Sequence, residues 1–292
     1  MNNPYYKFLK RDVKIALIAF ISIVTVNVGM SVISNIISAL DGSSIEPIRF
    51  FSQASMLAYI MCMAYGINCT VKTFGGVISI RGDRLGFLKA IALWSITIAI
   101  FASLFSVFFE IGCKVLMELI TKRKVYVISD ISWISIDNLE FKVADVSLMW
   151  FIKSIITITL TNTLMISLGY MLGAISYRLK VRTNVILFIG VPILFAGYIS
   201  AQAFKNQDVV LDWVMKFIGA TLYVIQNPVI LISLQIIGII VFALIGTKFL
   251  IKAPIKDYAH DLIYYFIYRF KKIKRGLTLI YNPLFYKVNK LT

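Results

Sequence analysis

Few residues in this chain have side chains that could carry out chemistry, and their spacing fits no familiar catalytic pattern. The single histidine, His260, excludes a zinc site of the HExxH kind, which needs two histidines. The three cysteines, Cys62, Cys69 and Cys113, form no CxxC pair, and we interpret them as small buried residues. The sequence also lacks a GxSxG nucleophile motif and a phosphate-binding GxxxxGK[ST] motif. We therefore expect no catalytic residue, no metal site and no bound cofactor in this chain.

Three ionisable residues fall within or beside long apolar segments: Glu110, Lys114 and Lys153. Charged groups at membrane depth are costly, and they usually mark functional sites. These three lie near the ends of their segments, where long side chains can reach water at the interface. We expect them to do so. The helix interiors would then lack the buried carboxylates that proton- or sodium-coupled carriers need.

The elements that hold these residues are long apolar segments, which predict an integral membrane protein. The chain has 292 residues, of which 59% are hydrophobic and only 15% are charged. A helix needs about 20 apolar residues to cross a bilayer, and its backbone groups are satisfied internally, as lipid requires. Six segments meet this condition and predict an all-α, polytopic fold. They lie at about residues 15–40, 50–71, 88–119, 149–177, 185–203 and 229–251.

We expect these helices to form one domain, residues 1–251, with three further polar or amphipathic segments. Residues 121–145 contain KVYVIS and SWISI runs, which predict one or two short strands. Residues 204–227 are amphipathic and predict one or two short helices at the membrane face. Residues 252–292 form a basic, aromatic cytosolic tail, in which we expect residues 258–275 to lie on the membrane surface.

The positions of lysine and arginine predict that both termini are cytosolic. Cytosolic loops of membrane proteins are enriched in these residues. The N-terminal segment, the loop after the second predicted helix, the turn at 178–182 and the tail together hold most of the 30 lysines and arginines. Anionic lipid headgroups then account for the net charge of +16, and we exclude nucleic acid as a partner.

Mild polar residues that we expect at mid-membrane depth are the candidates for a substrate path: Asn27, Asn35, Asn68 and Thr70. Each has two interpretations, because such side chains either form hydrogen bonds in helix packing or line a path for cargo. A different kind of pattern occurs in the fourth predicted helix, where Gly169 and Gly173 form a GxxxG motif. This motif predicts close helix packing.

The loop between the second and third predicted helices is rich in glycine and mixed in charge. Its distinctive residues are Gly76, Ser79, Arg81, Asp83, Arg84 and Phe87. This segment resembles the permease subunits of type-2 ABC exporters, in which a Gly…Ser-Arg…aromatic segment after the second helix docks on an ATPase. Six helices and an amphipathic segment before the last one also fit that family. Ile80 between the serine and the arginine, the polar stretch at 121–145 and the long tail depart from it.

The resemblance implies a permease subunit of an ATP-driven exporter in a bacterial plasma membrane. It implies as partners a separate ATP-binding subunit, which holds ATP and Mg²⁺, a second permease copy or homologue, and the membrane lipids. The cargo would be amphipathic or hydrophobic, such as a peptide. The chain itself would not be an enzyme. Two alternatives stay open: an ATP-independent carrier or channel, and a non-transporting membrane assembly or immunity partner.

Overall fold

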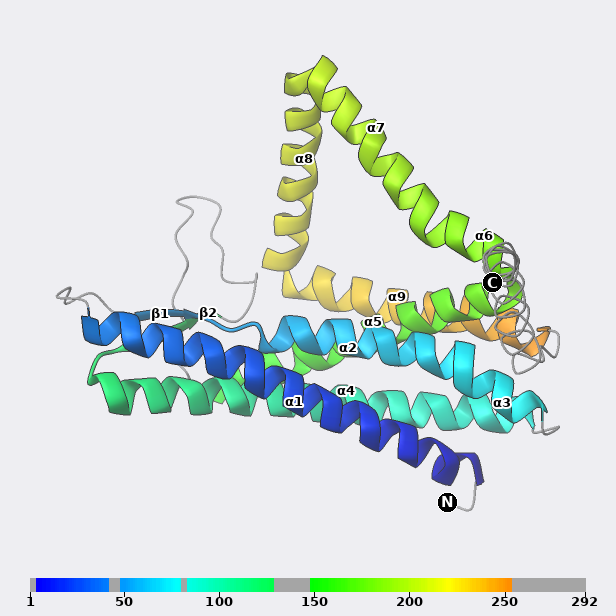
Figure 1. Ribbon diagram of the computed structural model, residues 1–292, viewed down its shortest axis with the longest axis horizontal. Helices are drawn as coiled ribbons and strands as arrows, with labels where there is room; N and C mark the ends of the chain where they lie inside the picture. The colour runs from blue at the N-terminus through cyan, green and yellow to red at the C-terminus, as the bar shows by residue number, and fades with distance from the viewer. Residues whose placement is uncertain (1–3, 42–47, 80–82, 129–147, 254–292) are drawn as a thin grey trace, which may run out of the picture.

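In the computed structural model, the chain forms a bundle of long helices with a small sheet at one end (Figure 1). The structure describes residues 4–41, 48–79, 83–128 and 148–253. These residues contain six helices that are long and apolar enough to cross a membrane, which confirms the predicted all-α membrane fold. The spans are Tyr5–Ala39, Ala54–Thr73, Arg84–Thr121, Phe151–Arg178, Thr183–Gln202 and Pro228–Ile251.

Five helices make up the bundle, and one of them lies at its centre. They are α1 (Pro4–Asp41), α2 (Ala54–Asn68), α4 (Arg84–Thr121), α5 (Leu148–Arg178) and α9 (Pro228–Ile251). Helix α5 contacts α2, α4 and α9, while α1 packs against α4 and α2. Helix α1 begins well before the predicted residue 15, so the basic N-terminal segment is part of the helix.

Helix α2 changes its winding before the loop that leads to α4. A π-helical turn, η1 (Cys69–Thr73), follows α2 and continues into α3 (Phe74–Ser79). Such turns insert one extra residue into a helix and occur frequently at functional sites.

The sheet consists of two short parallel strands, β1 (Ile48–Phe51) and β2 (Val125–Ile128), with Ile48 opposite Val125. Strand β2 confirms the prediction made from the KVYVIS run, whereas the SWISI run lies outside the described residues. Strand β1 was not predicted. Residues 50–51 therefore belong to a strand, and the prediction that the second helix begins at residue 50 is wrong. The aromatic and β-branched residues of β1 pair with β2, and α2 begins only at Ala54.

Helices α7 (Val191–Lys205) and α8 (Gln207–Gln226) leave the bundle and form an open hairpin (Figure 1). They follow α6 (Val181–Val185) and a second π-helical turn, η3 (Ile186–Gly190). The amphipathic segment at 204–227 thus contains one helix of 20 residues. The described side chains of α7 and α8 are mostly exposed and apolar, so this hairpin depends on lipid or another chain for burial.

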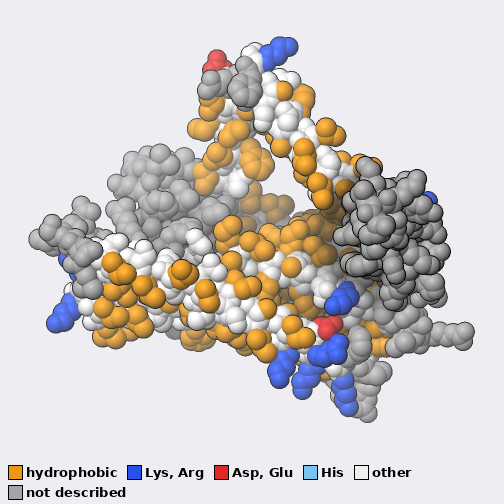
Figure 2. All heavy atoms as spheres, in the orientation of Figure 1, with side chains coloured by type: hydrophobic (Ala, Val, Ile, Leu, Met, Phe, Trp, Pro, Cys, Tyr) orange, Lys and Arg blue, Asp and Glu red, His pale blue; other side chains and the backbone are white. Residues whose placement is uncertain are grey.

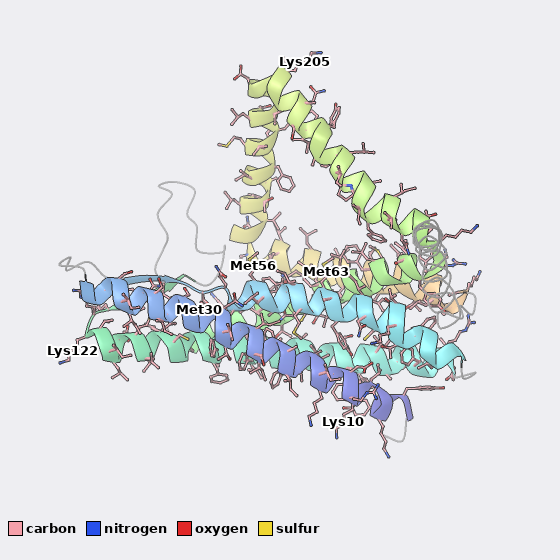
Figure 3. All side chains as sticks on the ribbon, in the orientation of Figure 1. Lys10, Met30, Met56, Met63, Lys122 and Lys205 are labelled. Carbon is pink, nitrogen blue, oxygen red and sulfur yellow. The ribbon has the colours of Figure 1, made fainter. Side chains whose placement is uncertain are left out.

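The ends of the bundle differ in composition from its sides. Lys122, at the sheet, marks what we call the strand end, and Lys10 lies toward the opposite, N-terminal end (Figure 3). Hydrophobic side chains cover the sides, whereas lysine and arginine gather toward the ends of the bundle and at the tip of the α7–α8 hairpin, where Lys205 lies (Figures 2 and 3). This distribution suits a bilayer around the middle of the bundle. The cytosolic position of both termini stays a prediction, as does the surface helix at 258–275, which lies outside the described residues.

Candidate functional site

The segment that resembles an ATPase-docking element lies at the N-terminal end of the bundle, between α2 and α4. Gly76 and Ser79 belong to α3, but the surroundings of both, like all of Arg81, lie outside the described part of the chain. The structure therefore describes the surroundings of three of the six residues: Asp83, Arg84 and Phe87.

Asp83 forms the N-terminal cap of α4. Its carboxylate accepts hydrogen bonds from the backbone N–H groups of Leu85 at 3.1 Å and Gly86 at 2.9 Å. A cap of this kind contributes about 1 kcal/mol to helix stability. The backbone N–H of Asp83 also donates to the hydroxyl of Tyr5 in α1, so the start of α4 is fixed to the start of α1.

Arg84 and Phe87 connect the same segment to further helices. The guanidinium of Arg84 donates to the carbonyl of Ile251, the last residue of α9. Arg178 of α5 acts similarly, because its guanidinium donates to the carbonyl of Lys252 at 3.3 Å. Phe87 is 0% exposed, and its ring contacts the rings of Tyr5 and Phe74. The described residues of this segment thus join α1, α3, α4 and α9.

The four candidate path residues do not converge on one site. Asn27 is exposed, Asn35 is half-buried, and each donates to the carbonyl four residues earlier in α1, at 2.9 and 2.8 Å. Asn68 is exposed at the end of α2. Thr70 is buried, and its hydroxyl donates to the carbonyls of Gly66 and Ile67 within its own helix. Their hydrogen bonds therefore favour a role in helix structure for Asn35 and Thr70.

Asn27 belongs to a face of α1 that points away from the bundle and contains other polar residues. Further along this face lies a shallow groove, near Met30 in the half of α1 closer to the strand end (Figure 3). Met30, Ile33, Ser34, Ile37 and Ser38 line this groove. Asn27 and Ser38 each donate to the carbonyl four residues earlier in α1, at 2.9 and 3.0 Å. Their side chains nevertheless expose polar atoms along a membrane-spanning helix, which favours a partner or a path there.

The GxxxG motif of α5 packs closely against α2, and this confirms the close helix packing predicted from the motif. A Cβ atom at Gly169 would overlap the carbonyl oxygen of Met63, and one at Gly173 would overlap the Thr70 hydroxyl. Gly66 of α2 is equally close to the backbone of α5 at Ile166, a role that we had not predicted. A signal for it exists in the sequence, because small residues recur every four positions in α2. They are Ala54, Ala58, Cys62 and Gly66.

Glu110 is the buried carboxylate that sequence analysis missed. It is 1% exposed, and its Oε1 atom accepts hydrogen bonds from the hydroxyls of Ser52 at 2.8 Å and Ser55 at 3.3 Å. The prediction that Glu110 reaches interface water is therefore wrong. The reason is that α4 continues for about three turns beyond it. Lys153, by contrast, is exposed as predicted.

Lys114, one turn after Glu110, is half-buried and pairs with Glu118 at 3.9 Å. Within the described ranges, no three side chains of His, Cys, Asp or Glu gather as a metal site would require. Cys62, Cys69 and Cys113 are free thiols. The first two are buried as predicted, whereas Cys113 is only half-buried.

Comparisons with protein-family models, with curated proteins and with solved structures find no match to this chain. The multi-pass membrane fold thus follows from the helices themselves. A family assignment has only the sequence resemblance at residues 76–87 and the helix layout in its favour.

Proposed function

We propose that this chain is the transmembrane permease subunit of an ATP-driven exporter of the type-2 ABC kind. ATP and Mg²⁺ would be bound by a separate subunit that docks on residues 76–87. The observation that carries the proposal is the attachment of this segment to several helices at once. A docking element must pass motion to the helices around a path, and an isolated flexible loop would not do so.

The attachments give that motion a physical route. Asp83 caps α4 and bonds to Tyr5 of α1, and Arg84 bonds to the end of α9. A displacement of the α3–α4 segment by an ATPase therefore pulls on α1, α4 and α9 together. Because packed helices have discrete arrangements, such a pull shifts the bundle between states rather than bending it continuously.

The substrate path would lie between two copies of the chain, along the outward face of α1. Asn27, Ser34 and Ser38 are exposed on this face among apolar residues. A second copy would remove these polar groups from lipid, and a mixed polar and apolar lining suits an amphipathic cargo such as a peptide. The exposed α7–α8 hairpin offers further apolar surface for assembly.

Charge reversal in the docking segment tests the proposal. We expect the Arg81→Glu, Arg84→Glu double variant to lose co-purification with the ATP-binding subunit and to lose stimulated ATPase activity. The Lys122→Glu, Lys124→Glu variant is the matched control, because it makes the same change in charge at the strand end. An unchanged complex and unchanged ATPase activity in the Arg81, Arg84 variant would refute docking at this segment.

An ATP-independent carrier is the second candidate, and Glu110 favours it. Coupled carriers use carboxylates inside the membrane, and Glu110 is a buried carboxylate within the span Arg84–Thr121. Cargo movement in sealed vesicles separates the two functions. The exporter requires ATP hydrolysis by the partner, whereas the carrier works with an ion gradient alone.

A further inference from the structure

A carboxylate–hydroxyl cluster lies inside the bundle near its strand end. It consists of Glu110 of α4, Ser52 just before α2, and Ser55 in the first turn of α2. All three residues are buried. Both serine hydroxyls donate to the same carboxylate oxygen, and the Ser52 hydroxyl also accepts from the Ala54 backbone N–H at 3.3 Å. The cluster therefore links α4 to the start of α2.

The chemistry of this cluster suits a group that gains and loses a proton. Moving a carboxylate out of water costs several kcal/mol when it is ionised, and binding a proton removes the charge. A serine hydroxyl can donate to an ionised carboxylate and can accept from a protonated one. Ser52 and Ser55 can thus satisfy Glu110 in either state by rotating their hydroxyl hydrogens, without any change in the backbone.

Buried polar groups continue from Glu110 toward the middle of the bundle. Ser106 lies one turn earlier on α4, is 0% exposed, and its hydroxyl has no hydrogen-bond partner among the described residues. Ser103 lies one turn earlier again, and its hydroxyl is 2.6 Å from the hydroxyl of Thr159 in α5. Asn162, one turn along α5, donates to the carbonyl of Ala99 at 3.5 Å. Helix side chains lean toward the N-terminus, so Glu110 leans toward Ser106.

Few other titratable groups lie on the elements around the cluster. Cys113 is close enough on α4 to interact electrostatically with Glu110. Lys114 pairs with Glu118, and Lys153 of α5 is exposed. The titratable side chains of α2 are those of Tyr59, Cys62 and Tyr65. Each strand has one such residue, Arg49 in β1 and Tyr126 in β2, and the side chains of these two lie outside the described part of the chain. Three basic residues come directly before β2: Lys122, Arg123 and Lys124.

We propose that Glu110, held by Ser52 and Ser55, is a proton-binding site inside the membrane-spanning bundle. The step is the addition of one proton to the carboxylate, which gives a neutral carboxylic acid and breaks no bond. The protonated carboxyl group of Glu110 can then donate a hydrogen bond, which the carboxylate cannot do. The direction of the hydrogen bonds between Glu110 and the two serine hydroxyls therefore depends on this proton. The proposal is independent of whether ATP or an ion gradient drives the protein.

Infrared difference spectroscopy on the purified full chain in lipid vesicles tests the site directly. A protonated carboxyl group has a C=O stretching band that an ionised one lacks. Among the bands of the 14 aspartates and glutamates, we expect one that appears and disappears with pH in the wild-type protein and is absent from Glu110→Gln. Glu118→Gln is the matched control, since Glu118 lies two turns further on the same helix with its side chain 36% exposed. This control variant should keep the band.

The serines provide a second test that does not depend on folding of the Glu110→Gln variant. Ser52→Ala removes the shorter of the two hydrogen bonds, so we expect the frequency of the band to change. Elution as a single species in size-exclusion chromatography would show that each variant is folded. A wild-type protein without a pH-dependent band, a band that survives in folded Glu110→Gln, or a frequency unchanged by Ser52→Ala would overturn the proposal.

Discussion

Replacing Gly169 by alanine introduces a methyl group at the point where α5 crosses α2. The new Cβ atom would overlap the carbonyl oxygen of Met63, and it would lie 2.9 Å from the Met63 carbonyl carbon and 3.1 Å from its Cα atom. Ordinary van der Waals contact begins at 3.4 Å, so the helices must separate by about half an ångström at the carbonyl carbon and by more at the oxygen. All of these atoms are backbone, and no side-chain rotation can relieve the overlap.

The expected cost follows from this geometry. Overpacking by one methyl group destabilises a well-packed interior by about 1–3 kcal/mol. We expect Gly169→Ala to reach the upper part of this range, because the neighbouring contact of Gly66 with Ile166 is also lost when the helices separate. Gly173→Ala should cost less, since its severe overlap is with the Thr70 hydroxyl, a side-chain group, and the nearest backbone atoms, the Cα and carbonyl oxygen of Ile67, lie 3.0 Å away.

The assay is unfolding of the purified protein in detergent micelles, followed by loss of the folded species in size-exclusion chromatography after heating. Gly112→Ala is the control, because a Cβ atom at Gly112 of α4 has no atom within 4 Å. This substitution should be neutral or stabilise the helix by about 0.5–1 kcal/mol. If Gly169→Ala were as stable as Gly112→Ala, the close crossing of α2 and α5 would be refuted.

Three further predictions concern the other described contacts. Asp83→Ala removes both capping hydrogen bonds of α4 and should lower stability by about 1 kcal/mol, measured by the same heating assay, whereas Asp83→Asn should lose less. Ser103→Ala leaves the hydroxyl of Thr159 without its 2.6 Å partner and should cost about 1–3 kcal/mol, much of which the added Thr159→Val should restore. Asn27→Leu should leave stability unchanged within about 0.5 kcal/mol, because Asn27 bonds only within α1, but it should reduce transport if the outward face of α1 lines the path.

A sequence predicts a helix well when its apolar segment is long enough by itself to span a membrane. Residues 229–251 coincide with α9 almost completely, because their composition leaves no alternative to a spanning helix. Strand β1 could not be predicted in this way. Its residues continue into the apolar segment of α2, and its partner β2 lies more than seventy residues later in the chain.

In the candidate site, too, features set by a local sequence pattern could be predicted, and features set by distant contacts could not. The GxxxG motif was visible because it is a local pattern, and α2 does pack against it. The burial of Glu110 could not be predicted from the sequence, because it depends on contacts with Ser52 and Ser55 from a distant segment. It also depends on how far α4 continues beyond Glu110. Asp83 was assigned to docking, although an aspartate directly before a helix is also a common N-terminal cap.

Gentle detergent purification from native membranes, with mass spectrometry of the proteins that co-purify, tests the central claim most directly. The exporter account predicts an ATP-binding subunit in stoichiometric amount and a complex that contains a second copy of this chain or a homologue. Repeated purification of the chain without any ATP-binding partner would contradict the account and leave Glu110 as the basis for a carrier.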